Sequence, residues 1–133
     1  MAAPRSNELI SKPRPKFLDL TVIRLPLAGF VSILHRVSGS VLFLALPALI
    51  GLFALSLTSP AGFERAAHLM RQPMIAIPLF GLAWAYMHHF CAGIRFLFLD
   101  LDKGVDLRTA RITSWIVILA GLALTAIFGA RLW

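Results

Sequence analysis

The chain has 133 residues, 59% of them hydrophobic and 14% charged, and a formal net charge of +7. A soluble domain is about half apolar and a quarter charged, so this composition excludes both a soluble enzyme and an intrinsically disordered chain. The excess of basic residues would suggest nucleic-acid binding in a soluble protein, but here the bases flank apolar runs, as they do in membrane proteins. We therefore expect a membrane protein with lipid around it and no nucleic-acid partner.

Residues 1–28 are predicted to form a polar, cytoplasmic N-terminal arm. Four prolines interrupt this segment, so it contains no apolar core of a cleavable signal peptide. The rest of the chain, residues 29–133, is predicted to be one transmembrane domain.

Three charge-free stretches, at 37–57, 73–94 and 112–130, define the expected spans. Each has about the 20 residues that a helix needs to cross the hydrocarbon, and none alternates as a barrel strand would. With their flanks they predict helices over about 29–57, 73–99 and 111–132. The predicted fold class is all-α, an integral membrane anchor with three transmembrane helices. The segment between the first two helices is expected to be an outer loop.

The distribution of bases predicts the orientation. Eight bases lie on the arm and in the second loop, against three in the first loop and the tail. By the positive-inside rule the N-terminus is cytoplasmic and the C-terminus is outside.

The first predicted helix carries polar side chains near its cytoplasmic end. Arg36 can extend back to the headgroups as a snorkelling arginine. Ser32, however, lies four residues earlier and shares its face, so the hydroxyl and the guanidinium together suit a carbonyl or carboxylate ligand. His35 lies beside them, one to two turns below the surface.

The second predicted helix carries adjacent histidines, which point about 100° apart and so do not ligate one metal together. His89 belongs to a ridge of small residues that allows close approach, whereas His88 shares its face with Trp84. We therefore expect His89 to be the better buried ligand. Two interpretations stay open for it, an interhelical hydrogen bond and haem ligation. The small residues of the ridge are Gly81, Ala85 and Gly93.

No self-contained catalytic machinery is found in the sequence. It has no nucleophile–base pair, phosphate-binding loop or pair of carboxylates. The single cysteine, Cys91, forms no internal disulfide, and a zinc or iron–sulfur site would need several thiols. His68, in the expected outer loop, is predicted to be solvated.

These residues resemble a known family. The segment 32–39, with the sequence SILHRVSG, is similar to the first-helix signature of the cytochrome b556 subunit of succinate dehydrogenase, the larger of its two membrane anchors. In the second helix His89, the Gly93-Ile94-Arg95 motif and Asp100 have the spacing of that family. The resemblance extends from about Arg14 to Trp133. One departure occurs at Phe96, where the bacterial pattern often has a histidine that approaches a haem propionate.

The resemblance implies roles for individual residues. His89 matches the axial ligand of haem b, and His35 and Arg36 match groups near the propionates. Ser32 and Arg36 match residues of the ubiquinone pocket, and Asp100 matches an acidic residue near it. Because His35 is better placed for a propionate than for iron, we predict that the second axial ligand comes from another membrane subunit, which shares the haem.

The resemblance also implies a complex in the inner membrane of a bacterium. The chain would be a non-catalytic subunit, part of a heteromeric helix bundle with a second membrane anchor, a flavoprotein and an iron–sulfur subunit. Electrons from succinate would reach ubiquinone through this assembly. Two alternatives stay open: a haem-free structural or transport-related membrane module, and the anchor of a fumarate reductase.

Overall fold

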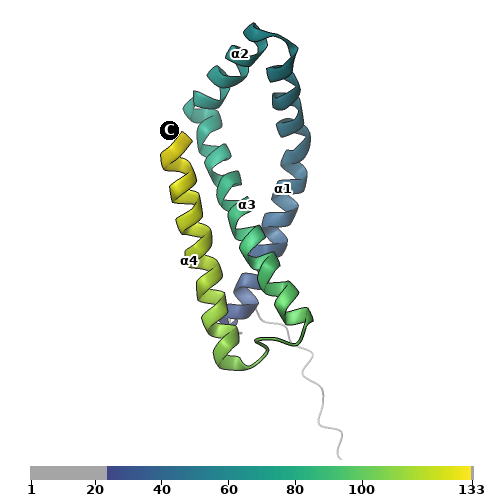
Figure 1. Cartoon of the computed structure of the whole chain (residues 1–133), viewed down its shortest axis with the longest axis vertical. Coiled ribbons are helices and arrows are strands. Elements are labelled where there is room, and N and C mark those ends of the chain that lie inside the picture. Colours follow the sequence, from purple (N-terminus) through teal and green to yellow (C-terminus); the bar gives the residue numbers. More distant parts are fainter. Residues whose placement is uncertain (1–23, 133) are drawn as a thin grey trace, which may run out of the picture.

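The computed structural model describes residues 24–132, which form four helices in chain order. They are α1 (Leu27–Thr58), α2 (Pro60–Arg71), α3 (Pro73–Asp100) and α4 (Leu107–Leu132) (Figure 1). Most of the arm, with four of its five bases, lies outside the described residues, as does Trp133. The predictions that fall on these residues therefore have no structural counterpart here.

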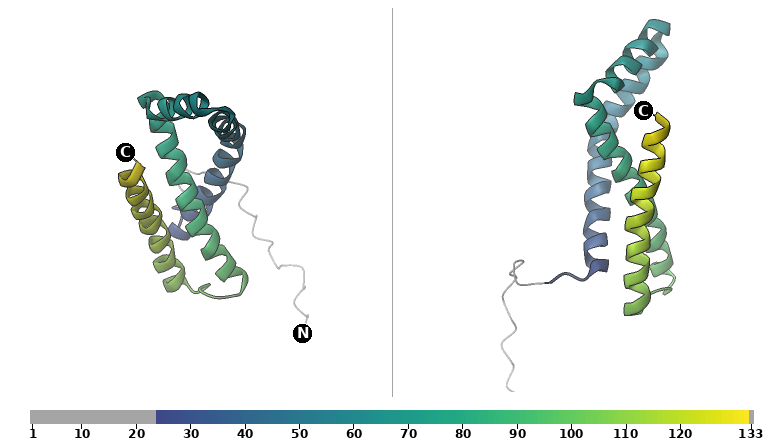
Figure 2. Two further views of the ribbon diagram at one scale, coloured as in Figure 1. Left: turned by 45° about the horizontal axis from the view of Figure 1, so that its top comes forward. Right: turned by 90° about the vertical axis from the view of Figure 1, so that its left-hand side faces the viewer.

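Three of the four helices, α1, α3 and α4, are long and apolar enough to cross a membrane. This confirms the predicted all-helical fold with three spans. Helices α1 and α3 approach each other near the α3–α4 loop and diverge toward α2, which bridges their far ends (Figure 1). Helix α4 returns along α3 and ends near the start of that helix (Figures 1 and 2).

The expectation of a loop between the first two spans is wrong, because residues 60–71 form the helix α2. Its start has a local cause: the Ser59 hydroxyl accepts a hydrogen bond from the Gly62 amide at 3.0 Å, and Pro60 occupies the first helical turn. Gly62 and Ala66, four residues apart, are its buried positions. His68 on this helix is exposed, as predicted.

Large apolar side chains cover the outside of the bundle, including Phe43 (74% exposed) and Ile77 (73% exposed). Such exposure is expected of helices whose solvent is lipid. The buried apolar core is small and consists of Val31, Ala92 and Val117, one from each long helix. Packing within this chain alone thus covers only one stripe of each span.

Helices α3 and α4 meet along a seam that two glycines of α4 make possible. A Cβ atom on Gly121 would lie 3.3 Å from the Cα of His88, and one on Gly129 would lie 2.6 Å from Cε2 of Phe80. The two glycines lie about two turns apart on α4, and their partners His88 and Phe80 lie about two turns apart on α3. The two contacts therefore share one antiparallel register. Small residues at such contacts let helix backbones approach closely in membranes.

Candidate functional site

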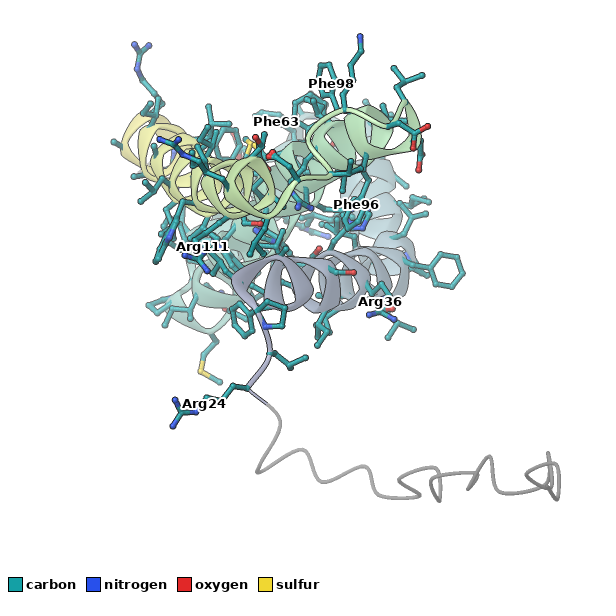
Figure 3. All side chains as sticks on the ribbon, turned by 90° about the horizontal axis from the view of Figure 1, so that it is seen from below. Arg24, Arg36, Phe63, Phe96, Phe98 and Arg111 are labelled. Carbon is teal, nitrogen blue, oxygen red and sulfur yellow. The ribbon has the colours of Figure 1, made fainter. Side chains whose placement is uncertain are left out.

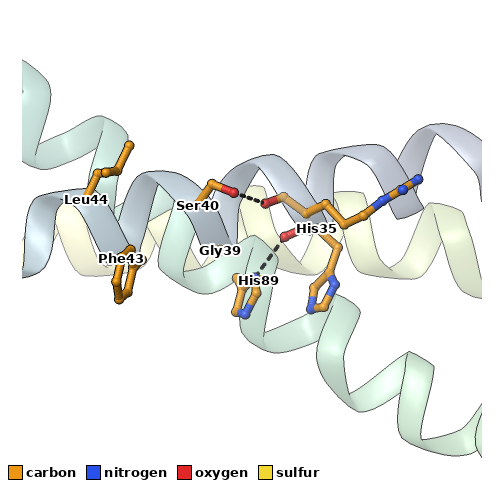
Figure 4. A pocket seen from close by; sticks show the side chains of 7 residues that line it. His35, Gly39, Ser40, Phe43, Leu44 and His89 are labelled. Atoms are coloured by element: carbon orange, nitrogen blue, oxygen red, sulfur yellow. Dashed lines mark hydrogen bonds between the residues drawn. The ribbon is translucent and has the colours of Figure 1, made fainter.

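The site forms where α1 and α3 approach each other, and it centres on two histidines. The imidazole rings of His35 on α1 and His89 on α3 are stacked, with centroids 4.2 Å apart and an interplanar angle of 6°. Figure 4 shows both rings on the same side of α1. The fold thus brings together two histidines that the sequence places 54 residues apart.

The hydrogen bonds of His89 define the roles of its two ring nitrogens. Nδ1 lies 3.0 Å from the backbone carbonyl oxygen of His35, and because a carbonyl only accepts, Nδ1 carries the proton and donates. The Ser38 hydroxyl, which donates to the same carbonyl at 2.9 Å, lies 3.2 Å from Nδ1. In the neutral imidazole, Nε2 is therefore the nitrogen that carries the free lone pair. This is the arrangement that holds a metal-ligating histidine in the correct tautomer.

Ser38 and Gly39 contribute to this geometry, although the sequence reasoning gave neither a role. Gly39 lies against the His89 ring, and a Cβ atom there would come within 2.7 Å of Cε1. Only glycine leaves the ring in its place. The signal was available in the sequence, since both residues belong to the SILHRVSG segment and lie three and four residues after His35.

A wide groove opens beside the two histidines, with a volume of about 600 Å³. His89 and His35 line it together with one charged residue, Arg36. Its remaining lining residues are Gly39, Ser40, Phe43 and Leu44, all on α1. An imidazole with a free Nε2, a cation at the edge and apolar walls suit a flat, largely apolar group that carries a metal and anionic substituents.

The expectation that His89 is the better buried histidine is wrong. His88 is only 1% exposed, whereas His89 is half-buried. The reason is the seam with α4: His88 packs on Gly121 and stacks on Trp84 at 5.4 Å, while His89 faces the groove. Within residues 24–132, Nε2 of His88 has no hydrogen-bond partner. His88 is therefore the packed histidine and His89 the accessible one, which is the reverse of the prediction.

The predicted quinone residues occupy one end of the bundle. Ser32 and Arg36 share a face of α1, where the Arg36 Nε lies 3.4 Å from the Ser32 carbonyl oxygen. The Arg36 side chain is exposed and points away from α3 and α4 (Figure 3). Asp100 is exposed at the last residue of α3. The part of the chain described here thus places Ser32 and Arg36 together, and gives Asp100 no hydrogen bond or ion pair with either.

Phe96 lies next to the histidine pair. Its ring centroid is 5.0 Å from that of His35, and the Arg95 guanidinium carbon lies 5.7 Å from the same phenylalanine ring. The Phe96 ring therefore packs against the His35 ring at a tilt. Arg95 itself points to α4, where its Nε donates to the Thr113 hydroxyl at 3.0 Å.

The architecture and the groove beside the two histidines place this chain among helical membrane subunits. Residues 10–128 match the model of the succinate dehydrogenase/fumarate reductase transmembrane subunit family. The chain belongs to this family, and the resemblance seen in the sequence is confirmed.

Individual relatives agree with the family match. The chain is 33% identical over 119 residues to the succinate dehydrogenase cytochrome b556 subunit of Rickettsia typhi, covering 90% of this chain and 92% of that protein. It is 32% identical to the protein of the same name from Paracoccus denitrificans, covering 86% and 88% of the two chains. The corresponding protein of Coxiella burnetii is 31% identical, covering 90% and 97%.

Proposed function

We propose that this chain binds haem b through His89 and anchors a succinate dehydrogenase in the membrane. The observation that supports the haem site best is the hydrogen bond from His89 Nδ1 to the His35 carbonyl, which leaves Nε2 free beside the groove. The name of the relatives, cytochrome b556, fits this assignment. Bound haem b supplies a reversible one-electron couple.

The second axial ligand is proposed to come from another membrane subunit. His35 is the histidine whose ring contacts His89, but the two rings are stacked face to face on one side of α1. Rings stacked in this way would not both offer a ring nitrogen to one metal. We propose that His35 and Arg36 would instead hold the anionic groups of the haem. A haem shared in this way by two chains would stabilise their association.

Absorption spectra of the purified complex test this assignment. We expect His89→Ala to abolish the low-spin haem spectrum, and imidazole added to His89→Gly to restore it in part. His88→Ala and His35→Ala should keep bis-histidine ligation. A low-spin spectrum in His89→Ala would refute the ligand. A high-spin spectrum in His35→Ala would place both ligands in this chain and overturn the shared haem.

Ubiquinone is proposed to bind at the end of α1, where Ser32 and Arg36 share a face. The Arg36 guanidinium would polarise a quinone carbonyl and stabilise the negative charge that develops on it during reduction. The Ser32 hydroxyl would hydrogen-bond to the quinone. Asp100, exposed on α3, would contribute only if another subunit closes the pocket around it.

Two activities of the same complex separate a quinone-site defect from a general one. Arg36→Leu and Ser32→Ala should lower ubiquinone reduction while succinate oxidation with an artificial acceptor survives. Ser56→Ala is a matched control on the same helix, because its hydroxyl lies outside the histidine groove and donates to the Phe53 carbonyl at 2.6 Å. Normal ubiquinone turnover in Arg36→Leu would contradict the proposal.

The partners and orientation follow from the same reading. A flavoprotein and an iron–sulfur subunit would dock at the end that carries the arm and the α3–α4 loop, and that end would face the cytoplasm of a bacterium. The basic residues support this, since most of them lie at that end. A reporter fused after Trp133 should therefore be periplasmic, and a cytoplasmic signal would reverse the topology. Co-purification should recover three partner subunits.

A further inference from the structure

We propose that the groove between α3 and α4, near the loop that joins them, binds an anionic phospholipid from the adjoining leaflet. The groove has a volume of about 330 Å³ and lies outside the histidine site. Two cations, Arg95 and Lys103, line it, and its remaining walls are mostly apolar. The phosphate would lie against the cations and one acyl chain along the helices.

Arg95 is a buried cation, and residues 24–132 form no ion pair with it. It is 7% exposed, and its hydrogen bonds go to two neutral oxygens, the Thr113 hydroxyl at 3.0 Å and the Ala110 carbonyl at 3.5 Å. No Asp or Glu is among the residues that line the groove. Ionisable groups inside a span are costly and are normally paired, so this charge calls for an external anion.

The direction of the Arg95 side chain indicates where that anion lies. Its Nε bonds to Thr113, whereas its terminal Nη2 reaches Ala110, which is one turn closer to the start of α4. The guanidinium thus extends toward the membrane surface, as snorkelling arginines do. Arg95 lies five residues before the end of α3, which is about 7.5 Å along the helix.

Lys103 brings a second positive charge to the rim of the groove. It lies in the α3–α4 loop, and the following residue, Gly104, has a φ of +80°, which turns the chain back toward α4. The loop holds two carboxylates, Asp102 and Asp106, and neither lines the groove. Asp106 accepts hydrogen bonds from the Thr109 amide and so caps α4. Basic pockets between membrane helices at such a level bind anionic lipid headgroups.

The walls below the cations favour an acyl chain over a soluble anion. Ile94, Phe98 and Ile116 line the groove and are exposed on the bundle surface. Phe98 points away from α1 (Figure 3). A soluble phosphate or carboxylate would gain nothing from these walls, whereas a phospholipid would use both parts of the site.

Photocrosslinking in the intact complex tests whether the phospholipid binds in this groove. A benzophenone side chain would replace Phe98, and in a control it would replace Phe90, which is equally exposed on α3 (54% against 53%) but does not line the groove. In nanodiscs of phosphatidylcholine with a minority of phosphatidylglycerol, position 98 should capture phosphatidylglycerol in excess of its share. Position 90 should capture both lipids in proportion. Proportional capture at both positions, or capture of a protein subunit at position 98, would overturn the proposal.

Native mass spectrometry of the complex tests the role of charge. Lys103→Ala should lower the affinity for phosphatidylglycerol about five-fold, because one base near the surface contributes about that factor. Arg111→Ala is the matched control, since it removes the same charge from the opposite side of α4 (Figure 3). An equal loss in the two variants, or equal binding of phosphatidylcholine by the wild type, would show non-specific attraction and sink the site.

Discussion

Gly39 and His89 are matched in shape across the contact between α1 and α3. A Cβ atom at position 39 would lie 2.7 Å from the His89 Cε1, a distance that real Cβ atoms essentially never show, and 3.3 Å from its Nδ1, which is a tight contact. The absent side chain lets His89 reach the His35 carbonyl, and that bond in turn determines which nitrogen is free. A backbone position thus controls the chemistry of a side chain on another helix.

Gly39→Ala is expected to disturb the haem without removing any ligand. The new methyl group pushes the His89 ring away from α1, so the hydrogen bond to the His35 carbonyl lengthens. We expect a weakened or altered low-spin haem spectrum in the purified complex. Gly51→Ala on the same helix is the control, because a Cβ atom there meets nothing within 4 Å. Identical spectra in the two variants would contradict the role of Gly39.

Ser38→Ala is expected to weaken haem retention while leaving the ligand in place. The Ser38 hydroxyl donates to the carbonyl that orients His89, and partners of this kind typically affect metal affinity about 10–100-fold. The measurement is the rate at which haem transfers from the complex to an acceptor protein such as apomyoglobin. Ser56→Ala should not change this rate, since Ser56 lies outside the groove and donates to the Phe53 carbonyl instead. Equal rates in wild type and Ser38→Ala would remove Ser38 from the site.

Gly121→Leu is expected to destabilise the α3–α4 seam. A Cβ atom at position 121 already lies 3.3 Å from the His88 backbone, which does not move aside as a flexible side chain would. Overpacking of this kind costs about 1–3 kcal/mol, so the complex should unfold at a lower temperature. Ala123→Leu on the same helix, at an exposed position, should leave the transition unchanged. A normal melting temperature for Gly121→Leu would mean that the seam adapts.

Asp106 gives the start of α4 a pH dependence. Hydrogen bonds from the Thr109 side chain and, secondly, from the Thr109 amide lower the pKa of the Asp106 carboxylate. Because the pKa is lower in the folded state, the stabilisation is fully present above the unfolded value of about 3.9. It is lost as pH falls through the folded pKa.

Hydrogen exchange at the Thr109 amide measures this effect. Protection should fall on acidification in the wild type and should be low at every pH in Asp106→Ala. Asp106→Asn keeps an oxygen acceptor without a titrating group, so its protection should not change with pH. The same acid sensitivity in Asp106→Asn would assign the effect to another group.

Part of this protein was predictable because it depends on composition and short spacing. The three spans follow from runs of apolar residues, since only a helix satisfies its own backbone in lipid. Helix α2 was not predicted, because long apolar runs indicate only the membrane spans. Ser59 and Pro60 nevertheless form a recognisable helix start. The family membership rests on the SILHRVSG segment and the Gly93-Ile94-Arg95 motif, which are local patterns.

The environment of each histidine depended on how the helices cross. A sequence places His88 and His89 about 100° apart on one helix but does not show which side α4 covers. Gly121 brings α4 against His88, and this buries the histidine that was expected to be the more accessible one. Hydrogen bonds such as that from His89 to His35 join residues 54 positions apart. The spans, the family and the residue types near the membrane surface follow from local patterns in the sequence. The burial of His88 and the tautomer of His89 do not, because both depend on contacts between helices.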